Sequence, residues 1–195
     1  MSGMPVIIFD DLNGNIGYLM DLAINASPET VNFMIKKAKG LVYVCIPEQL
    51  ALQLQLPSMK EYPFHHSSKD FTVSVDYKTT TTGISAHERS DTIKAFLDPS
   101  TTDDDFKRPG HVFPLISHGI RSGKEFGIAE AAVSLAQLSC NESIAYVCEI
   151  LNVRGEVADW PELQQFSQQY GLNIISMSDI LLMRSRPQMK GAAIG

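Results

Sequence analysis

The sequence predicts an α/β (α+β) fold, a single domain in which helices flank a mixed β-sheet. Runs rich in valine, isoleucine, phenylalanine and tyrosine, which are typical of buried strands, recur along the whole chain. Segments of helical periodicity alternate with these runs. No repeat, low-complexity stretch or linker divides the 195 residues, and this length suits one domain with a sizeable core. We therefore expect one domain over residues 1–184 and a flexible C-terminal tail over residues 185–195.

The composition is that of a globular protein, with 44% apolar and 19% charged residues. The net charge of −6 argues against nucleic acid as a partner, because binding to phosphates needs clustered Lys and Arg. No apolar stretch approaches the roughly 20 residues that span a bilayer, and the N-terminus lacks the features of a secretory signal. Three cysteines without a C-x-x-C pair fit a reducing compartment. We expect a cytoplasmic protein that binds neither nucleic acid nor membrane.

Strand-like composition predicts six strands, at residues 5–9, 40–46, 71–77, 111–116, 144–151 and 172–177. The stretch FDDLNGNIGYLMDLA (9–23) begins at the end of the first of them and is interpreted as a loop that opens a helix. Loops between a strand and a helix often carry catalytic groups. After Asp10 and Asp11, however, this loop continues as Asn13 to Gly17 with no further acid or base.

Helical periodicity and end signals predict five helices, at residues 27–39, 85–98, 125–139, 160–171 and 177–186. Ser27 is the expected N-cap of the first, and Gly40 after three lysines its stop signal. Ser85, three residues before a glutamate, predicts a capping box for the second. Gly171 is expected to end the fourth, and Ser178 to cap the fifth.

The remaining polar clusters have ordinary structural explanations. The five histidines lack the spacing of zinc ligands, and the adjacent His65 and His66 are expected in an exposed loop. Asp103 to Asp105 form the only run of charge, which fits a solvated turn or helix start.

The stretches TTTTGISAHER (79–89) and RPGHVFPL (108–115), together with several others in the same order, resemble the 3,4-dihydroxy-2-butanone 4-phosphate synthase family of riboflavin biosynthesis. These two stretches are the most specific, and the resemblance runs in the family's order over about residues 5–184. The others are ASPETVNFMIKKAKGLVYVCIPEQL, FTVSVDYK, AEAAVSLAQLS and VCEILNVRGEVADWPELQQF. The resemblance implies the family's α/β fold and a homodimer with active sites at the subunit interface. It also implies conversion of ribulose 5-phosphate to 3,4-dihydroxy-2-butanone 4-phosphate and formate, with magnesium.

The first acidic segment of the family's site is altered in this chain. In the family, the opening loop carries an Arg-Glu-Asn-Glu-Gly-Asp run that binds metal and transfers protons. Here the run falls on residues 13–18, where only Asn15 and Gly17 match. The Arg, the two Glu and the Asp are replaced by Asn13, Gly14, Ile16 and Tyr18.

The second segment is altered in the same sense. The family's Arg-x-Gly-His-Thr-Glu pattern aligns with EFGIAE, so Glu125 replaces the phosphate-binding Arg. Ile128 replaces the metal-ligating His and Ala129 the Thr, while Gly127 and Glu130 remain. Ile cannot ligate magnesium, and a Glu repels a phosphate. We therefore predict a divergent active site with a lost magnesium site and no metal ligands.

The family's reactive cysteine aligns with Tyr43, and Cys45 lies two residues later. Strand alternation places Cys45 on the same side as Tyr43, so it is either a displaced reactive thiol or a buried inert one.

Several positions that line the family's pocket still carry polar groups. The candidate catalytic residues are His111, Glu149, Tyr43 and Tyr18, and the candidate substrate-binding residues are Thr81, Thr82, Asn15 and Cys45. His111 can serve as acid or base, and Glu149, in an apolar strand, as a carboxylate of raised pKa. The structural alternatives are that His111 caps a turn and Glu149 binds backbone amides. Glu88, Arg89 and Arg108 are expected in structural ion pairs, while Asp10, Asp11, Arg121 or Lys124 could rebuild a displaced site.

Three functions remain open. We expect a repurposed enzyme, a metal-independent lyase, isomerase or cyclase on a small, non-phosphorylated carbonyl or sugar-derived molecule, in a homodimer with an interface active site and no cofactor. The first alternative is a non-catalytic dimeric homologue with a binding or scaffold role, whose pocket should be collapsed or filled by side chains. The second is a genuine synthase, for which magnesium is expected.

Overall fold

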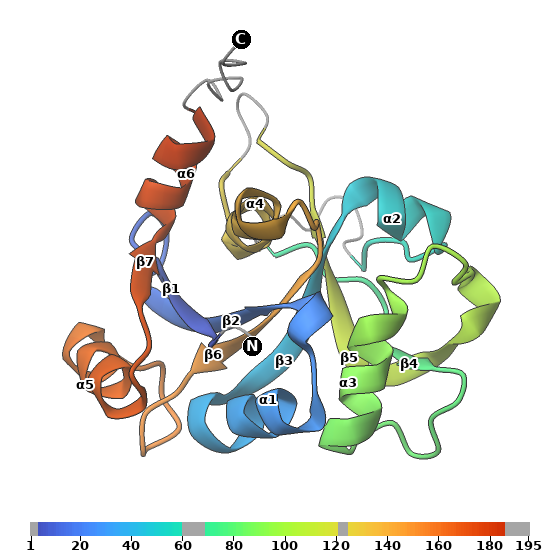
Figure 1. Ribbon diagram of the computed structural model, residues 1–195, viewed down its shortest axis with the longest axis horizontal. Coiled ribbons are helices and arrows are strands. Elements are labelled where there is room, and N and C mark those ends of the chain that lie inside the picture. Colours follow the sequence, from blue (N-terminus) through green and yellow to red (C-terminus); the bar gives the residue numbers. More distant parts are fainter. Residues whose placement is uncertain (1–3, 60–68, 121–124, 186–195) are drawn as a thin grey trace, which may run out of the picture.

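The computed structural model describes residues 4–59, 69–120 and 125–185. In these ranges a mixed seven-stranded sheet has the order β4-β5-β3-β6-β2-β1-β7, which confirms the predicted fold class (Figure 1). The β1–β7 and β3–β5 pairs are parallel, and the other neighbours are antiparallel. The strands are β1 Val6–Asp10, β2 Ile16–Leu22, β3 Lys39–Pro47, β4 Val75–Tyr77, β5 Phe106–Ser117, β6 Ala145–Ile150 and β7 Ile174–Ser176.

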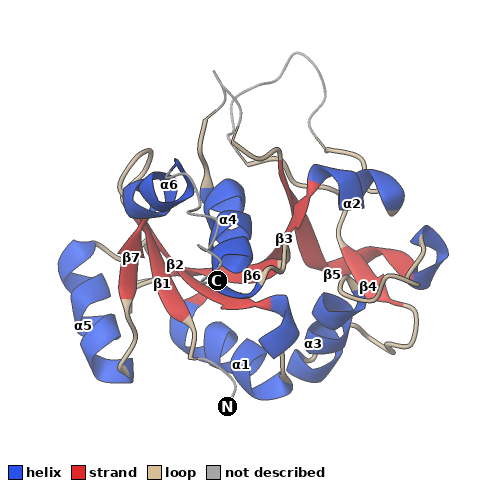
Figure 2. Ribbon diagram, turned by 45° about the horizontal axis from the view of Figure 1, so that its top comes forward, coloured by secondary structure: helices blue, strands red, loops and turns tan. Residues whose placement is uncertain are grey.

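Helices cover both faces of this sheet (Figures 1 and 2). The α-helices are α1 Pro28–Phe33, α2 Glu48–Gln53, α3 Ala86–Ala95, α4 Ile128–Cys140, α5 Trp160–Tyr170 and α6 Met177–Ser185. A π-helical turn, Met34–Ala38, extends α1, and short 3-10 turns span Ala23–Asn25 and Asp103–Asp105. The turn at Asp103–Asp105 confirms the turn expected at the aspartate run. None of the helices in the described ranges has the length and apolarity needed to cross a membrane.

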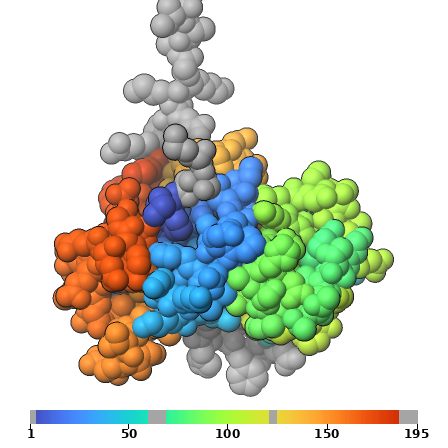
Figure 3. All heavy atoms as spheres, turned by 60° about the horizontal axis from the view of Figure 1, so that its bottom comes forward, coloured from blue at the N-terminus to red at the C-terminus, as the bar shows by residue number. Residues whose placement is uncertain are grey.

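Two apolar cores lie on opposite faces of the sheet. The first includes Val31 and Met34, Ile93 of α3 and Leu163 of α5. The second is formed against α4 and α6 and includes Tyr18, Tyr43, Cys45, Ile128 and Ile180. Figure 3 looks onto the first face, where the blue N-terminal part of the chain lies between the green middle part and the orange C-terminal part.

The prediction of a helix after the first loop is wrong. Residues 16–22 form β2, which pairs antiparallel with β1, so the opening loop is the turn of a hairpin. Asn15 adopts a left-handed conformation there, with φ of 52°. The segment is buried on both faces, because Tyr18 and Met20 contribute to one core and Leu19 to the other. A strand buried on both faces loses the polar alternation that distinguishes it from a helix.

Two of the predicted strands differ most from the observed bounds, and one helix was not predicted. Regular pairing in the segment 71–77 is confined to β4, while β5 begins five residues earlier than expected. The β4–β5 register shifts between Val75 and Asp76. At this point a Cβ on Gly110 would lie 2.1 Å from the carbonyl carbon of Val75. Only glycine permits this close approach of the backbones. The unpredicted helix is the short α2.

The end signals are mostly local and mostly confirmed. Ser27 and Ser85 cap α1 and α3, and Gly171 ends α5 in a left-handed conformation. Gly40 does not stop the first helical segment, because Lys39 takes the left-handed position with φ of 68°. Gly40 instead lets β3 approach β6, since a Cβ there would lie 2.3 Å from the carbonyl oxygen of Glu149.

The cap of α6 is Ser176 and not Ser178, because the Oγ of Ser176 accepts a hydrogen bond from the amide of Asp179. Ser178 lies inside the helix and donates its amide to Asp11. His65, His66, Arg121, Lys124 and the tail from residue 186 lie outside the described residues. The domain boundary at residue 184 stays a prediction.

Candidate functional site

Four side chains from separate parts of the chain meet on one face of the sheet. They are Tyr18 of β2, Tyr43 of β3, Glu149 of β6 and Lys69, and we call them the Lys69 cluster. Tyr18 lies opposite Glu149 in the β2–β6 pair, and Tyr43 lies opposite Val147 in the β3–β6 pair. Opposite residues share a face and alternate residues return to it, so the two tyrosines and Glu149 point to the same side.

Lys69 brings a positive charge into this group. Its Nζ lies 2.7 Å from Oε1 of Glu149, and 5.2 and 5.3 Å from the ring centres of Tyr18 and Tyr43. The side chains of Lys69 and Glu149 are 26% and 17% exposed. A carboxylate and two aromatic faces therefore stabilise a cation at one defined point, and they do so more strongly than at a fully solvated surface.

The residues that follow Lys69 are fixed by the fold. The carboxylate of Asp70 is 2.8 Å from Nε2 of His118, and the carbonyl oxygen of Asp70 accepts a hydrogen bond from the amide of Ile116. The ring of Phe71 meets the ring of Tyr43 edge-on, with 5.2 Å between their centres. These contacts tie the chain at Lys69 to β5 and β3, so the position of the ammonium group does not depend on one ion pair alone.

Two polar atoms of the cluster are buried without a hydrogen-bond partner among the described residues: Oη of Tyr43 and Oε2 of Glu149. Burial, and next the charge of Glu149, raises the pKa of Tyr43 well above its ordinary value. The same two causes, in the same order, raise the pKa of Tyr18. Both hydroxyls therefore keep their protons at neutral pH and can donate a hydrogen bond. Such atoms are unusual, because most buried polar groups have a hydrogen-bond partner.

The cavity beside the cluster is small. It has a volume of about 20 Å³ and is lined by Tyr18, Lys69, Ile128 and Glu130, among others. That space holds about one water molecule, whereas ligand pockets are typically about 300–1,000 Å³. A sugar-sized ligand therefore does not fit inside this cavity, and Lys69 is accessible only through the 26% of its side chain that is exposed.

The other candidate residues lie in different surroundings. Cys45 is fully buried, and burial is the first cause that raises the pKa of its thiol, which disfavours the reactive thiolate. Asn15 is exposed in the hairpin turn. Among the described contacts, neither side chain is hydrogen-bonded to the Lys69 cluster, although Cys45 and Tyr43 belong to the same apolar core.

His111, Thr81 and Thr82 form hydrogen bonds with acidic residues outside the cluster. The Nδ1 of His111 is 2.8 Å from a carboxylate oxygen of Asp76, and its amide also donates to that carboxylate. Thr81 and Thr82 both donate their hydroxyls to Glu88. His111 does share a sheet face with Tyr43, because it lies two residues before Phe113, the partner of Tyr43 in the β3–β5 pair.

Some structural alternatives from the sequence are wrong. Glu149 does not bind backbone amides in the described contacts, since its Oε1 accepts from Lys69. Arg108 donates to the backbone carbonyls of Asp103, Phe106 and Leu54, and within the described ranges it forms no ion pair with a carboxylate. Glu88 accepts from Ser85 and two threonines and forms no ion pair in the described part of the chain.

The acids nearest the opening loop are engaged by hydrogen bonds from neighbouring segments. Oδ1 of Asp10 accepts from the amides of Leu12 and Asn13 and from the side chain of Asn13. The two oxygens of Glu130 accept from the amides of His118 and Gly127. Asp11 accepts from the amide of Ser178 at the start of α6.

Magnesium prefers several carboxylate or other oxygen ligands in octahedral geometry. Across residues 4–59, 69–120 and 125–185, no three His, Cys, Asp or Glu side chains gather in a way that could hold a metal ion. The loss of the magnesium site through substitution stays a prediction.

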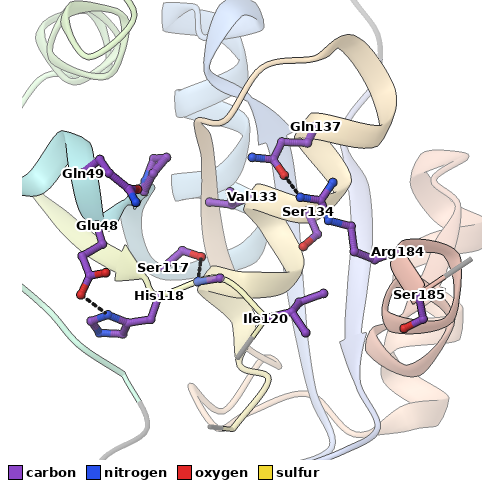
Figure 4. A pocket seen from close by; sticks show the side chains of 12 residues that line it. Glu48, Gln49, Ser117, His118, Ile120, Val133, Ser134, Gln137, Arg184 and Ser185 are labelled. Atoms are coloured by element: carbon purple, nitrogen blue, oxygen red, sulfur yellow. Dashed lines mark hydrogen bonds and ion pairs between the residues drawn. The ribbon is translucent and has the colours of Figure 1, made fainter. Parts of the chain in front are cut away.

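A larger cavity, of about 440 Å³, lies between α2, α4, α6 and the end of β5 (Figure 4). His118 points towards Glu48 on one side of it, with 2.9 Å between Nδ1 and Oε1, and Arg184 donates to Gln137 on the other. His118 also contacts Asp70, the residue that follows Lys69.

Sequence reasoning missed Lys69 and His118. Lys69 stands just before the apolar run that starts at Phe71, and no motif spacing links it to Glu149, 80 residues later. The only available signal was a lysine directly next to a family-like segment. His118 directly follows β5 but belongs to no motif.

Comparisons with known proteins agree with the fold. The family model for 3,4-dihydroxy-2-butanone 4-phosphate synthase matches residues 1–183. A protein named 3,4-dihydroxy-2-butanone 4-phosphate synthase, from Oceanobacillus iheyensis, is 41% identical over 186 residues, which are 95% of this chain and 90% of that protein. The riboflavin biosynthesis protein RibBA of Bacillus cytotoxicus is 43% identical over 186 residues, 94% of this chain. The chain spans about half the length of that relative, 46%.

Solved structures are similar as well. The two-domain synthase RibBX from A. baumannii superposes with a TM-score of 0.87 at 33% identity, over 95% of this chain and 56% of that one. A 3,4-dihydroxy-2-butanone 4-phosphate synthase in complex with two magnesium ions superposes with a TM-score of 0.83 at 29% identity, over 93% of this chain and 90% of that one.

Proposed function

The chain belongs to the 3,4-dihydroxy-2-butanone 4-phosphate synthase family, and on this basis we propose that it is a lyase or isomerase acting on a small sugar-derived ketone at the Lys69 cluster. The observation that carries the proposal is the pair of buried polar atoms without partners, Oη of Tyr43 and Oε2 of Glu149, beside the ammonium group of Lys69.

These groups supply what enolisation of a ketone requires. A carboxylate such as Glu149 can remove a proton from the carbon next to the carbonyl group, acting as general base. Tyr43 and Tyr18 hold their protons at neutral pH and can donate hydrogen bonds to the oxygen on which negative charge develops. The positive charge of Lys69 stabilises the same oxygen. Each of these roles is performed by a side chain of the cluster itself.

Ribulose 5-phosphate is the first substrate to test. Relatives at 41–44% identity that bear the synthase and RibBA names favour the synthase reaction over the non-phosphorylated substrate expected from the substitutions. The finer proposal, that the reaction proceeds without magnesium, rests on Asp10 and Glu130. Both are engaged by N–H groups of their own surroundings.

The deciding experiment is incubation with ribulose 5-phosphate, with and without magnesium, while formate is followed by proton NMR. Catalytic formate release without magnesium is the expected result. Release that depends strictly on magnesium would identify a standard synthase and overturn the metal-independent proposal. If no formate appears in either condition, the substrate is not ribulose 5-phosphate. Non-phosphorylated ketones are then tested as substrates.

A second candidate is the non-catalytic homologue, which is favoured by the cavity of only about 20 Å³. Such a protein should show no shift in melting temperature with any sugar-derived ketone. Glu149→Gln should then show the same absence of a ketone-induced shift in melting temperature as the wild type. A ketone that raises the melting temperature of the wild type but not of Glu149→Gln would exclude this candidate.

A further inference from the structure

We propose that Lys69 binds ketones and aldehydes covalently, as an iminium ion. The inference deepens the proposed function and rests on it for the class of substrate. An iminium ion withdraws electrons from the neighbouring carbon, and in this way it activates a carbonyl compound without a metal ion.

The cluster stabilises a cation at the nitrogen atom of Lys69. Glu149 lies 2.7 Å from this nitrogen, and the faces of Tyr18 and Tyr43 lie about equally far from it, at 5.2 and 5.3 Å. An iminium ion carries the same single positive charge as the ammonium group it replaces. The contacts that stabilise the ammonium group therefore stabilise the covalent adduct too, and no charge is created or buried by the reaction.

The reaction balances with groups of the cluster alone. Glu149 first accepts a proton from the ammonium group of Lys69, and the neutral amine forms a bond to the carbonyl carbon. The carbonyl oxygen becomes a hydroxyl group, which leaves as water with the proton returned by Glu149. The net change is one ammonium group and one carbonyl compound converted to one iminium ion and one water, without oxidation or reduction. Glu149 acts as the general base and then as the general acid.

The second buried oxygen of Glu149 is available for this exchange. Its Oε2 has no hydrogen-bond partner among the described residues, while Oε1 is bonded to Lys69. The proton taken from nitrogen can therefore reside on a carboxyl group whose other oxygen makes no hydrogen bond to a described residue. Tyr43, whose Oη is also without a described partner, can donate to the departing oxygen.

The position of Lys69 also distinguishes it from a surface lysine. Its side chain is 26% exposed, compared with 54% for Lys78, which forms an ion pair with Asp105. Lys78 therefore provides a matched control, since it is likewise paired with a carboxylate, while its nitrogen lies over no aromatic ring of the described residues.

The experiment uses dihydroxyacetone as the probe, with sodium cyanoborohydride to reduce the iminium ion to a stable amine. Intact mass measurement counts the adducts, and peptide mapping over the whole chain locates them. We expect one main adduct, on Lys69. It should be lost in Lys69→Arg, which keeps the charge but cannot form an iminium ion, and be retained in Lys78→Arg. Glu149→Gln should slow its formation by at least about 10²-fold, the lower end of general acid–base effects.

Adducts spread evenly over many lysines, with Lys69→Arg no different from wild type, would show ordinary surface glycation and overturn the inference. Absence of an adduct on Lys69 in the wild type would do so too. Circular dichroism and the melting temperature establish that each variant is folded. Because the decisive comparison is the location of the adduct in the wild type, it stands even if Lys69→Arg fails to fold.

Failure of this inference and failure of the proposed function give different results. Formate release or another ketone conversion without trapping on Lys69 would leave the function standing and remove the covalent step. Trapping on Lys69 without turnover of any sugar-derived ketone would support the covalent site and overturn the proposed enzyme.

Discussion

At the residue scale, the proposed ligand site implies that the hydroxyl group of Tyr43 lowers the stability of the unliganded protein. It is buried without a partner among the described residues, and such a group costs about 1–3 kcal/mol relative to a paired one. Tyr43→Phe should therefore raise the free energy of unfolding by about 1 kcal/mol while it weakens ketone binding or trapping. Urea denaturation and the trapping assay measure the two effects.

Tyr146 supplies the control, because its hydroxyl is also buried but donates to Thr30, 2.7 Å away. Tyr146→Phe should lower the free energy of unfolding by about 1 kcal/mol without an effect on trapping. If both variants lose stability equally, the hydroxyl of Tyr43 has a structural partner and is not held for a ligand.

Glu88 predicts a pH dependence of stability. Hydrogen bonds from Thr81 are the first cause that lowers its pKa, from an ordinary value of 4.5 to about 2, with Ser85 and Thr82 contributing. A carboxyl whose pKa is lowered by folding stabilises the folded state at pH above the unfolded pKa, and this contribution disappears as the pH falls to the folded pKa. The stability from Glu88 should therefore be lost between about pH 4.5 and 2.

Urea unfolding of wild type and Glu88→Gln at a series of pH values measures this dependence. The two proteins should differ most above pH 4.5 and converge towards pH 2. A constant difference across this range would mean that Glu88 acts through packing and not through its charge. The same hydrogen bonds explain why Thr81 and Thr82, candidate substrate ligands from the sequence, are already occupied in this structure.

At the scale of elements, the close contact between β2 and α5 allows a direct test that residues 16–22 form a strand of the hairpin. A Cβ on Gly17 would lie 2.3 Å from a methyl carbon of Leu163, which is fully buried. Gly17→Ala should therefore destabilise the protein by about 1–3 kcal/mol through overpacking. Leu163→Ala alone should cost about 2–5 kcal/mol through the cavity that it leaves.

The double variant distinguishes this contact from a general loss of stability. Removing the leucine side chain makes room for the new methyl group, so the two effects should add to clearly less than their sum. Strict additivity, measured by urea denaturation of all four proteins, would contradict the packing of β2 against α5. It would also reopen the helical interpretation of residues 16–22.

At the scale of the whole molecule, we propose the homodimer with an interface active site that the resemblance implies. Light scattering should give twice the chain mass of 21.5 kDa. Ketone trapping on Lys69 should weaken when dilution separates the subunits, because a partner would complete the exposed side of the site. A monomer at all concentrations with full trapping would show that one chain suffices.

Much of the fold was predictable because its signals are local. Ser27, Ser85 and Gly171 mark helix ends through hydrogen bonds and backbone conformations that involve a few neighbouring residues. The strands at β1, β3 and β6 show the apolar, β-branched composition of buried strands. The motif stretches around TTTTGISAHER and RPGHVFPL were sufficient to identify the family.

By itself, then, the sequence determined the fold class, most helix ends and the family. The tertiary structure decided that residues 16–22 are a strand. It also decided that Glu88 accepts hydrogen bonds from the hydroxyls of Thr81 and Thr82, and that Lys69 forms an ion pair with Glu149. Periodicity and capping report hydrogen bonds between near neighbours, whereas the Lys69 cluster depends on the register of β2 and β3 against β6. That register is set by the packing of the two cores, which no short segment encodes.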